Sequence, residues 1–286
     1  MSEKILVTGA TGKFGRELVR GLLANDLDVK AGTRSPDRAR ELFGDRVEVV
    51  ELDYHRAETY DASVQWADRL LLTPPPFDPD AYETLRSFLD WAVASGTRHV
   101  VLLSAMGVDR VQELALWKLE RQLEEVGVDH TILRPNLYMQ NFGPGFLAEE
   151  IRNEGRVSLP AGSAAVSFVD VRDVAGVAHQ ALVGEEHFGL AHTLTGPRAL
   201  TMTEAAGILS EVTGRTIRYQ PIEEEGMRTF LEDRGWTEGR IETALGLFGS
   251  IREGARAPVT DTVSSILGRP AIPFETYARE NRGCWD

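Results

Sequence analysis

Three glycines at intervals of three residues constrain the fold of this chain more than any other feature. Gly9, Gly12 and Gly15 follow the apolar run Ile5-Leu6-Val7, and an amphipathic pattern begins at Phe14. A glycine-rich turn between a strand and a helix is typical of doubly wound sheets, where the helix N-terminus offers free N–H groups to phosphates. Gly9 would allow the tight turn, Gly12 the approach of a pyrophosphate, and Gly15 close packing of the helix. The turn therefore predicts a dinucleotide site, whose further expected contacts are Thr11, Lys13 and Phe14.

Short apolar runs alternate with helical periods through the first half of the chain. The predicted strands after the first are 29–33, 47–52, 69–73, 99–104 and 130–134, and helices are predicted at 80–95 and 112–126. Buried strands between amphipathic helices are what a parallel sheet covered on both faces requires. The sequence thus predicts the α/β class, with a doubly wound Rossmann domain over residues 1–155.

The second half of the chain is less regular. Strands are predicted at 166–171, 192–195 and 217–222, Thr201 and Glu204 form a capping box that begins a helix, and residues from 223 onward read as mainly helical. We expect residues 156–286 to form a smaller, mostly helical part that lines the substrate site. This part should be interleaved with the first domain and not stand apart from it.

Charge and cysteine content exclude several functions. The chain has 44 acidic and 31 basic residues, a net charge of −13, which disfavours nucleic acid as a partner. It has no apolar run of membrane-spanning length, and Met1-Ser2-Glu3-Lys4 does not begin a secretory signal. A single cysteine excludes internal disulfides and thiolate clusters, and the scattered histidines imply no metal. We expect a cytoplasmic monomer or homodimer that binds a small-molecule substrate.

The residues after the second predicted strand indicate which dinucleotide is bound. An NAD enzyme usually has an acidic residue there, whereas this chain has Arg34, with Arg38 one helical turn later. A guanidinium can bind a 2′-phosphate through two charge-assisted hydrogen bonds. The alternative is that both arginines only solvate the start of a helix. The pattern favours NADP, with NAD possible.

Other cofactor contacts are expected at the carboxyl ends of later strands, where such sheets bind ligands. Asp53 and Tyr54 could hold the adenine, and Thr73, Pro74 and Pro75 could form a rigid wall beside the dinucleotide. Either of these segments could equally be an ordinary loop. Ser104 ends the fifth predicted strand, where its hydroxyl could face the nicotinamide.

Several longer runs resemble one known family. They are Ile5-Leu6-Val7-Thr8-Gly9-Ala10-Thr11-Gly12, Leu71-Leu72-Thr73-Pro74-Pro75-Pro76, Trp117-Lys118-Leu119-Glu120, Thr131-Ile132-Leu133-Arg134-Pro135-Asn136, Tyr138-Met139-Gln140-Asn141-Phe142, Ser167-Phe168-Val169-Asp170-Val171-Arg172-Asp173-Val174 and Leu194-Thr195-Gly196-Pro197. With these runs the chain resembles the NmrA-like, atypical short-chain dehydrogenase/reductases. Within them it resembles the branch of festuclavine- and agroclavine-type ergot-alkaloid reductases and their bacterial relatives. The resemblance does not determine the activity, because the family includes reductases, quinone and azo reductases, and redox sensors without catalytic activity.

The usual proton donor of short-chain dehydrogenases is absent. These enzymes rely on Tyr-x-x-x-Lys, and here Leu114 stands at the tyrosine position, four residues before Lys118. The resemblance implies that Lys118 contacts the ribose or nicotinamide, and the alternative is a solvated helix lysine. If an acid is needed, Tyr138 is the first candidate and Ser104 the second. Pro135 and Asn136 are expected beside the nicotinamide.

Aromatic and apolar residues predict a flat, apolar substrate pocket, although each could instead belong to the core. They are Trp117, Tyr138, Met139, Phe142, Phe146 and Phe168. We expect an NADPH-dependent reductase that transfers a hydride to an iminium, a conjugated alkene or a quinone, in secondary metabolism. The alternative is a non-catalytic NADP(H) sensor that acts through a protein partner.

Overall fold

The computed structural model describes residues 3–286, apart from the side chain of Phe146. By its internal contacts the chain divides into two compact units. Unit 1 comprises Met1–Pro76, Asp80–Pro135 and Val171–Thr193, and unit 2 comprises Phe77–Pro79, Asn136–Asp170 and Leu194–Asp286. This division differs from the expected boundary at residue 155. The segment 171–193 returns to unit 1, because its helix packs on the first helix and its strand extends the main sheet.

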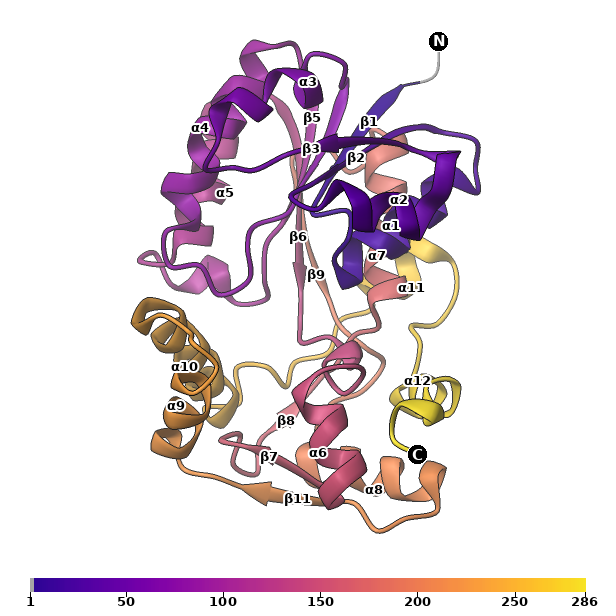
Figure 1. Ribbon diagram of the computed structural model, residues 1–286, viewed down its shortest axis with the longest axis vertical. Coiled ribbons are helices and arrows are strands. Elements are labelled where there is room, and N and C mark those ends of the chain that lie inside the picture. The colour runs from indigo at the N-terminus through magenta and orange to yellow at the C-terminus, as the bar shows by residue number, and fades with distance from the viewer. Residues whose placement is uncertain (1–2) are drawn as a thin grey trace. The chain divides into compact units, whose positions relative to one another are not determined.

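Unit 1 is built on a seven-stranded sheet in the order β3-β2-β1-β4-β5-β6-β9 (Figure 1). Its strands are β1 (Lys4–Thr8), β2 (Asp28–Thr33), β3 (Glu48–Glu51), β4 (Arg69–Leu72), β5 (His99–Leu103), β6 (Asp129–Pro135) and β9 (Leu190–Leu194). The ladders from β3 to β6 are parallel. Gly189 N–H bonds the His130 carbonyl, and Asn136 N–H bonds the Leu194 carbonyl, so β9 runs in the same direction. The predicted doubly wound parallel fold is confirmed.

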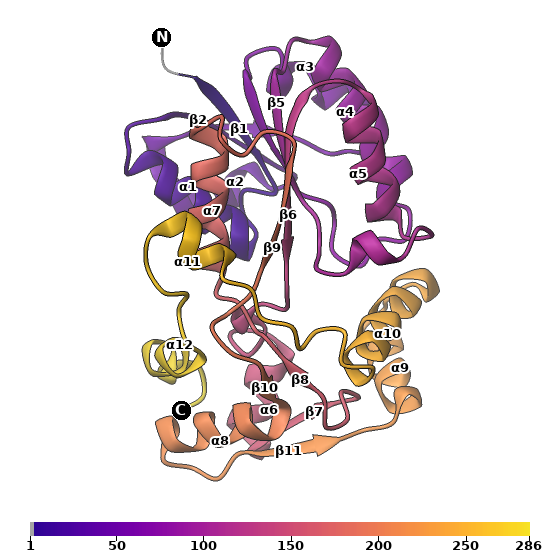
Figure 2. The ribbon, with the colours of Figure 1, turned by 180° about the vertical axis from the view of Figure 1, so that it is seen from behind.

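Helices cover both faces of this sheet. They are α1 (Lys13–Leu23), α2 (Pro36–Phe43), α3 (Asp61–Val64), α4 (Ala81–Ala94), α5 (Ala115–Glu125) and α7 (Val171–Val183), with short 3-10 turns η1 (Gly44–Arg46), η2 (Ala57–Thr59) and η3 (Val108–Arg110). The views from front and back show α4 beside α5, and α1 beside α7 (Figures 1 and 2). Strand side chains such as those of Leu70 and Leu72 are fully buried beneath α4. This is why the strands read as continuous apolar runs.

Unit 2 combines small sheets with helices. Its elements are η4 (Met139–Asn141), α6 (Phe146–Glu154), β7 (Arg156–Leu159), β8 (Ala165–Val166), β10 (Leu200–Thr201), α8 (Met202–Thr213), β11 (Arg218–Pro221), α9 (Glu224–Glu232), α10 (Glu238–Arg252), α11 (Thr262–Leu267), α12 (Phe274–Glu280) and η5 (Arg282–Cys284). Strand β11 pairs with β7 in parallel, and β10 pairs with β8 antiparallel (Figure 2). The predicted capping box is confirmed, since Thr201 accepts the Glu204 N–H and Glu204 accepts the Thr201 N–H.

Four elements differ from the sequence-based expectation. The strand expected over 166–171 is only the two-residue β8, because β8 pairs with an equally short β10 and Val171 already begins α7. The helix expected from residue 112 begins at Ala115, because the backbone of Leu114 is extended. Helix α6 and strand β7 were not predicted. None of the helices among residues 3–286 is long and apolar enough to cross a membrane.

Candidate functional site

The glycine turn of unit 1 has the geometry that its spacing predicts. Gly9 adopts φ +63°, the left-handed region that favours glycine, and a Cβ there would approach the Thr73 side chain to 3.3 Å. A Cβ on Gly15 would lie 2.3 Å from the Gly9 carbonyl oxygen, which cannot move away because it belongs to the turn backbone. Gly12 is the N-cap of α1, and its N–H bonds the Gly9 carbonyl over 2.9 Å. The turn therefore depends on these glycines.

The first turn of α1 carries excess positive charge. It contains no acidic residue, and no side chain in the described part of the chain caps it. Lys13 and Arg16 both lie there, and burial, together with the charge of Arg16, lowers the pKa of Lys13. The Nε atom of Arg16 is buried without a hydrogen-bond partner among the described residues. Cations at a helix N-terminus oppose the helix dipole, so this end of α1 is suited to an anion. Phe14, the second residue of α1, has a buried side chain, so its backbone N–H is the group that can contact a ligand.

Threonine hydroxyls connect the glycine turn to the neighbouring strands. The Thr73 N–H donates to Thr8 Oγ1 over 2.9 Å, and the hydroxyls of Thr11 and Thr33 share a hydrogen bond of 3.2 Å. Thr73 Oγ1 is buried without a partner in the described structure. A buried hydroxyl usually has a partner, so this atom is a candidate ligand contact. Pro74 and Pro75 follow Thr73, half-buried, at the carboxyl end of β4.

Arg34 and Arg38 are exposed just after β2, as expected for cations that could meet a 2′-phosphate. Neither forms an ion pair with any residue the structure describes, whereas Arg40 on the same helix pairs with Asp37 over 2.7 Å. The backbone between β2 and α2 is fixed because the Ser35 N–H donates to the buried Thr33 hydroxyl over 3.1 Å. Arg34 is therefore attached to a rigid turn while its side chain is available.

Tyr54 and Asp53 make local contacts beyond β3. The Tyr54 hydroxyl donates to the Thr73 carbonyl over 3.2 Å, and its ring meets Phe88 edge-on with centroids 5.1 Å apart. Burial raises the pKa of Tyr54, so its phenol remains protonated. The Asp53 carboxylate accepts the His55 N–H over 3.0 Å. The structure thus brings Tyr54 to Thr73 and the glycine turn, at the edge where the carboxyl ends of β1 and β4 lie.

Ser104 has a partner that the sequence did not predict. Its hydroxyl donates to Glu120 Oε1 over 2.5 Å, and Arg134 donates to both Glu120 oxygens. Glu120 stands in the run Trp117-Lys118-Leu119-Glu120, but an acid on an amphipathic helix reads as solvent-facing. Only the helical phase, three residues before buried Leu123, could have indicated burial. Pro135, which follows Arg134, is buried and accepts the Met106 N–H over 2.9 Å.

Lys118 is exposed on α5, four residues after Leu114. Leu114 itself is 39% exposed and therefore lies at the surface of unit 1. Lys118 forms no side-chain hydrogen bond or ion pair with the residues that the structure describes. Trp117 is half-buried, with the Arg121 guanidinium 5.7 Å from its ring centroid.

The remaining candidates belong to unit 2. Asn136 is buried, and its Nδ2 donates to Ser167 Oγ and the Arg256 carbonyl, each over 2.8 Å, while Oδ1 is without a partner in the described structure. Burial raises the pKa of Tyr138, which makes its phenol a weaker acid than usual. Three expected wall residues are only 1–2% exposed and lie in the apolar core, namely Met139, Phe142 and Phe168. The side chain of Phe146 lies outside the described part. No group of histidine, cysteine and acidic residues suited to a metal occurs among the described residues.

Comparisons with known proteins identify the family of this fold and site. The model of the NmrA-like family matches residues 1–255, and the chain belongs to this family, as its sequence runs predicted. It is 37% identical to a (4-alkanoyl-5-oxo-2,5-dihydrofuran-3-yl)methyl phosphate reductase of Streptomyces griseus (97% of each chain covered). It is 32% identical to an NAD(P)H azoreductase of Xenophilus azovorans (96% of each chain).

The expected similarity to ergot-alkaloid enzymes is also confirmed. The chain is 28% identical to agroclavine dehydrogenase of Claviceps fusiformis, over 98% of each chain. Among solved structures, triphenylmethane reductase of Citrobacter sp. in complex with NADP(H) superimposes with a TM-score of 0.83 at 24% identity, covering 97% of this chain and 99% of that one. At this identity the structural likeness supports the fold.

Proposed function

We propose that this chain is an NADPH-dependent oxidoreductase that transfers a hydride to a flat, apolar small molecule of the iminium, conjugated-alkene or quinone type. Family membership and relatives named as reductases support the reaction class. The observation that carries the proposal is the excess positive charge in the first turn of α1. A glycine-capped helix end with Lys13, Arg16 and no acidic residue is electrostatically unfavourable unless an anion binds it.

The residues of unit 1 fit NADPH well. The backbone N–H groups after Gly12 would bind the pyrophosphate, with Thr11 and Lys13 beside it. Arg34, with Arg38 one turn later, would bind the 2′-phosphate, since both are exposed and neither is paired with an acidic side chain among the described residues. Thr73 Oγ1 has the free hydrogen-bonding capacity that a ribose or phosphate would use. Asp53, Tyr54, Pro74 and Pro75 would border the dinucleotide, and Lys118 and Pro135 would lie toward its nicotinamide end.

When NADPH is bound, its nicotinamide supplies the hydride. The protein must therefore bind and orient the cofactor and the substrate and keep water away from them. An iminium carbon that accepts a hydride becomes a neutral amine without taking up a proton. A quinone needs protons, which water can supply to a stabilised anion. These acceptors suit a chain with Leu114 in place of the family tyrosine and with the acidity of Tyr138 weakened by burial. Tyr138, which keeps part of its surface exposed, is a proposed substrate contact, and buried Met139, Phe142 and Phe168 support the segment around it.

The test is a titration of tryptophan fluorescence with NADPH and with NADH, followed by an acceptor panel in the same solution. The panel contains a cyclic iminium ion, a conjugated enone and a quinone, and NADPH consumption is followed with each. We expect tight NADPH binding, weaker NADH binding and turnover of at least one acceptor. Tight binding without any turnover would favour a redox sensor. Absence of binding would refute the proposal.

We also propose that the protein acts in the cytoplasm on a small molecule of secondary metabolism, as a monomer or homodimer. The similarity to agroclavine dehydrogenase supports the type of metabolism. Size-exclusion chromatography with light scattering would determine the oligomeric state, with and without NADPH.

A further inference from the structure

The serine that follows β5, Ser104, is hydrogen-bonded to a buried carboxylate, that of Glu120. Glu120 of α5 is 0% exposed and accepts the Ser104 Oγ–H over 2.5 Å. Arg134, near the carboxyl end of β6, donates to the same carboxylate through Nε over 3.1 Å and through Nη2 over 2.6 Å. Hydride transfer as proposed above makes no use of Glu120. A charge buried this deeply is costly to maintain, and its three hydrogen bonds show how it is compensated.

The direction of the serine hydrogen bond follows from its partners. Arginine has only hydrogen-bond donors, and Arg134 donates to both carboxylate oxygens of Glu120, so both oxygens act as acceptors. Asp109 lies 3.6 Å from Arg134, and Arg121 lies 3.9 Å from Glu120, so each side of the pair has a further opposite charge. A carboxylate only accepts hydrogen bonds, so the bond to Ser104 uses the single proton of the serine. Its short length is that of a charge-assisted O–H···O⁻ bond. The Ser104 oxygen therefore has only lone pairs to offer to a ligand.

The strand order indicates which ligand group Ser104 meets, and this step rests on the proposed NADPH site. The order reverses between β1 and β4, and a dinucleotide crosses such a sheet at that reversal. The glycine turn and Arg34 follow β1 and β2, which assigns the adenosine half to that side. The nicotinamide half then faces the carboxyl ends of β4, β5 and β6. Ser104 follows β5 directly and therefore lies on the nicotinamide side.

We propose that Ser104, held by Glu120, accepts a hydrogen bond from the carboxamide N–H of the nicotinamide and is not a proton donor to the substrate. The carboxamide carries the N–H donors of the reacting ring. A quinone or enone oxygen would need a donor instead, which Ser104 cannot supply while its proton is bound to Glu120. Glu120 is thus a positioning residue. By fixing the serine proton it fixes the rotation of the nicotinamide, and hence which face of the ring carbon C4 is presented for hydride transfer.

The proposal is tested with a cofactor analogue that lacks the N–H group. The 3-acetylpyridine analogue of NADP⁺ has a methyl ketone in place of the carboxamide and can only accept a hydrogen bond. Calorimetric titration of the wild-type protein should give about tenfold tighter binding of NADP⁺ than of the analogue, the ratio expected for one charge-supported hydrogen bond. Ser104→Ala should weaken NADP⁺ binding by that factor and leave the analogue unchanged, so that the preference disappears. This variant keeps the Glu120–Arg134 pair, which favours normal folding.

The role of Glu120 is tested by combining its substitution with that of Ser104. Glu120→Gln should reduce the preference for NADP⁺ over the analogue. The double variant should lose no more NADP⁺ affinity than Ser104→Ala alone, because both changes act on one hydrogen bond. The matched control is Gln122→Ala, which removes another side-chain hydrogen bond of α5, the partly buried bond from Gln122 Nε2 to Asp90 over 2.7 Å. The control should lower the melting temperature but retain the preference for NADP⁺.

Three results would overturn the proposal. The first is equal wild-type affinity for NADP⁺ and its analogue, and the second is a preference that persists in Ser104→Ala. The third is independent, additive losses from Ser104→Ala and Glu120→Gln, which would show that Glu120 is only structural. If the wild-type protein binds neither dinucleotide, the proposed function itself fails, and this inference fails with it.

Discussion

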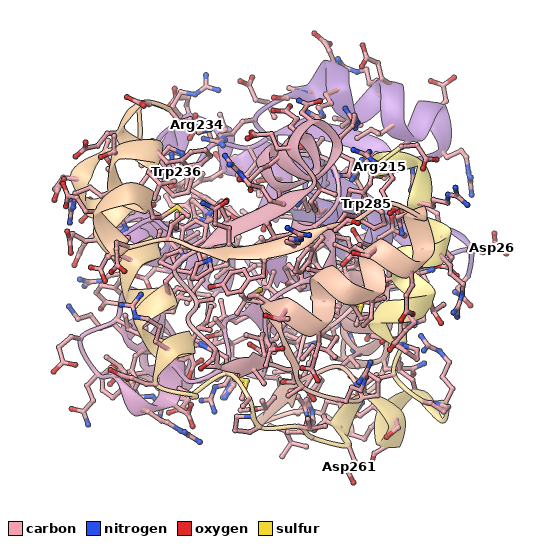
Figure 3. All side chains as sticks on the ribbon, turned by 90° about the horizontal axis from the view of Figure 1, so that it is seen from below. Asp26, Arg215, Arg234, Trp236, Asp261 and Trp285 are labelled. Atoms are coloured by element: carbon pink, nitrogen blue, oxygen red, sulfur yellow. The ribbon has the colours of Figure 1, made fainter. Side chains whose placement is uncertain are left out.

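The indole N–H of Trp285 donates to the main-chain carbonyl of Phe142 over 2.7 Å. Trp285 is the penultimate residue and is 0% exposed. Its own carbonyl accepts a hydrogen bond from Arg215 over 2.9 Å, and Figure 3 shows the two labelled side chains close together. The C-terminal end of unit 2 is therefore fixed to the segment that begins with Tyr138.

We expect Trp285→Phe to destabilise the protein by about 1–3 kcal/mol, because the Phe142 carbonyl would stay buried without its donor. The control is Trp91→Phe. Trp91 is 46% exposed, and its indole N–H bonds Asp61 at the surface, so this change should cost about 0.5 kcal/mol or less. Urea unfolding followed by circular dichroism measures both. Equal midpoints for the two variants would show that the Trp285 hydrogen bond contributes no stability.

Two glycines of α1 should respond to alanine in opposite ways. Gly15→Ala places a Cβ 2.3 Å from the Gly9 carbonyl oxygen, so the turn must shift, and both stability and NADPH affinity should fall. Gly21 lies on the same helix, and a Cβ added there would meet no atom within 4 Å outside its own helical turns. Gly21→Ala should raise stability by about 0.5–1 kcal/mol through the better helix propensity of alanine. Thermal unfolding and NADPH titration of both variants test this, and an unchanged NADPH affinity in Gly15→Ala would contradict it.

Arg34 should decide the preference for NADPH. Arg34→Ala should weaken NADPH binding by more than about tenfold, which corresponds to about 1.4 kcal/mol, and leave NADH binding nearly unchanged. Arg40→Ala is the matched control, since Arg40 is also exposed near β2 but is paired with Asp37. Titration with both cofactors distinguishes the two variants. Equal losses for NADPH and NADH in Arg34→Ala would refute the assignment of Arg34 to the 2′-phosphate.

Stability of unit 1 should fall in mild acid because of His99. Burial, reinforced by the charges of Arg69, His130 and His187, lowers the pKa of His99 to about 3. Its Nε2 shares a hydrogen bond with Thr131 over 3.1 Å, but its Nδ1 is buried without a partner in the described structure, so a second proton there would meet no acceptor.

The folded state therefore binds the proton more weakly than the unfolded state does, where the pKa is near 6.5. Stability should be full above about pH 6.5 and decrease as the pH falls toward about 3, by up to about 1.4 kcal/mol per pH unit for this group. Urea unfolding from about pH 7.5 to about pH 4.5, with His99→Gln alongside, measures the slope. A wild-type slope that is no steeper than that of His99→Gln would exclude His99 as its source.

The sequence was sufficient for the order of elements in unit 1 and for the glycine turn, because both depend on local rules. Apolar runs of strand length predicted β1 to β6, and Gly9 has the positive φ and Gly15 the close backbone contact that their spacing predicted. The assignment of residues 171–193 to unit 1 was not predicted. The helix of this segment contacts α1 and its strand extends the sheet beside β6, and such long-range partners leave no periodic signal.

Site residues beyond the glycine turn were harder to predict because an isolated residue does not show its burial. Met139 and Phe142 read as a pocket wall, but they are only 1% exposed. Ser104 read as a candidate acid, and its partner Glu120, 16 positions away on a helix, decides where its proton points. A sequence motif identifies the residue types at the end of a strand, whereas their hydrogen-bond partners are set by tertiary packing.

The surface position of Leu114 allows the family tyrosine to be restored. Leu114 is 39% exposed, precedes α5, and its carbonyl accepts the Lys118 N–H over 3.2 Å, so the two residues are one helical turn apart. Leu114→Tyr should fold normally and place a phenol near the Lys118 ammonium. A ketone acceptor needs a proton as the hydride arrives, whereas an iminium acceptor does not. We therefore expect Leu114→Tyr to raise kcat for a ketone by about tenfold or more and leave kcat for an iminium unchanged.

Leu114→Phe is the control for this change, because it adds the ring without the hydroxyl. Its kcat for the ketone should stay at the wild-type value, and a rise equal to that of Leu114→Tyr would indicate a packing effect. A rise specific to the tyrosine, with a pH profile that falls as the phenol ionises, would show that the wild-type chain lacks only the proton donor. An unchanged kcat in both variants would show that residue 114 does not reach the substrate, and the proton would then come from Tyr138 or from water.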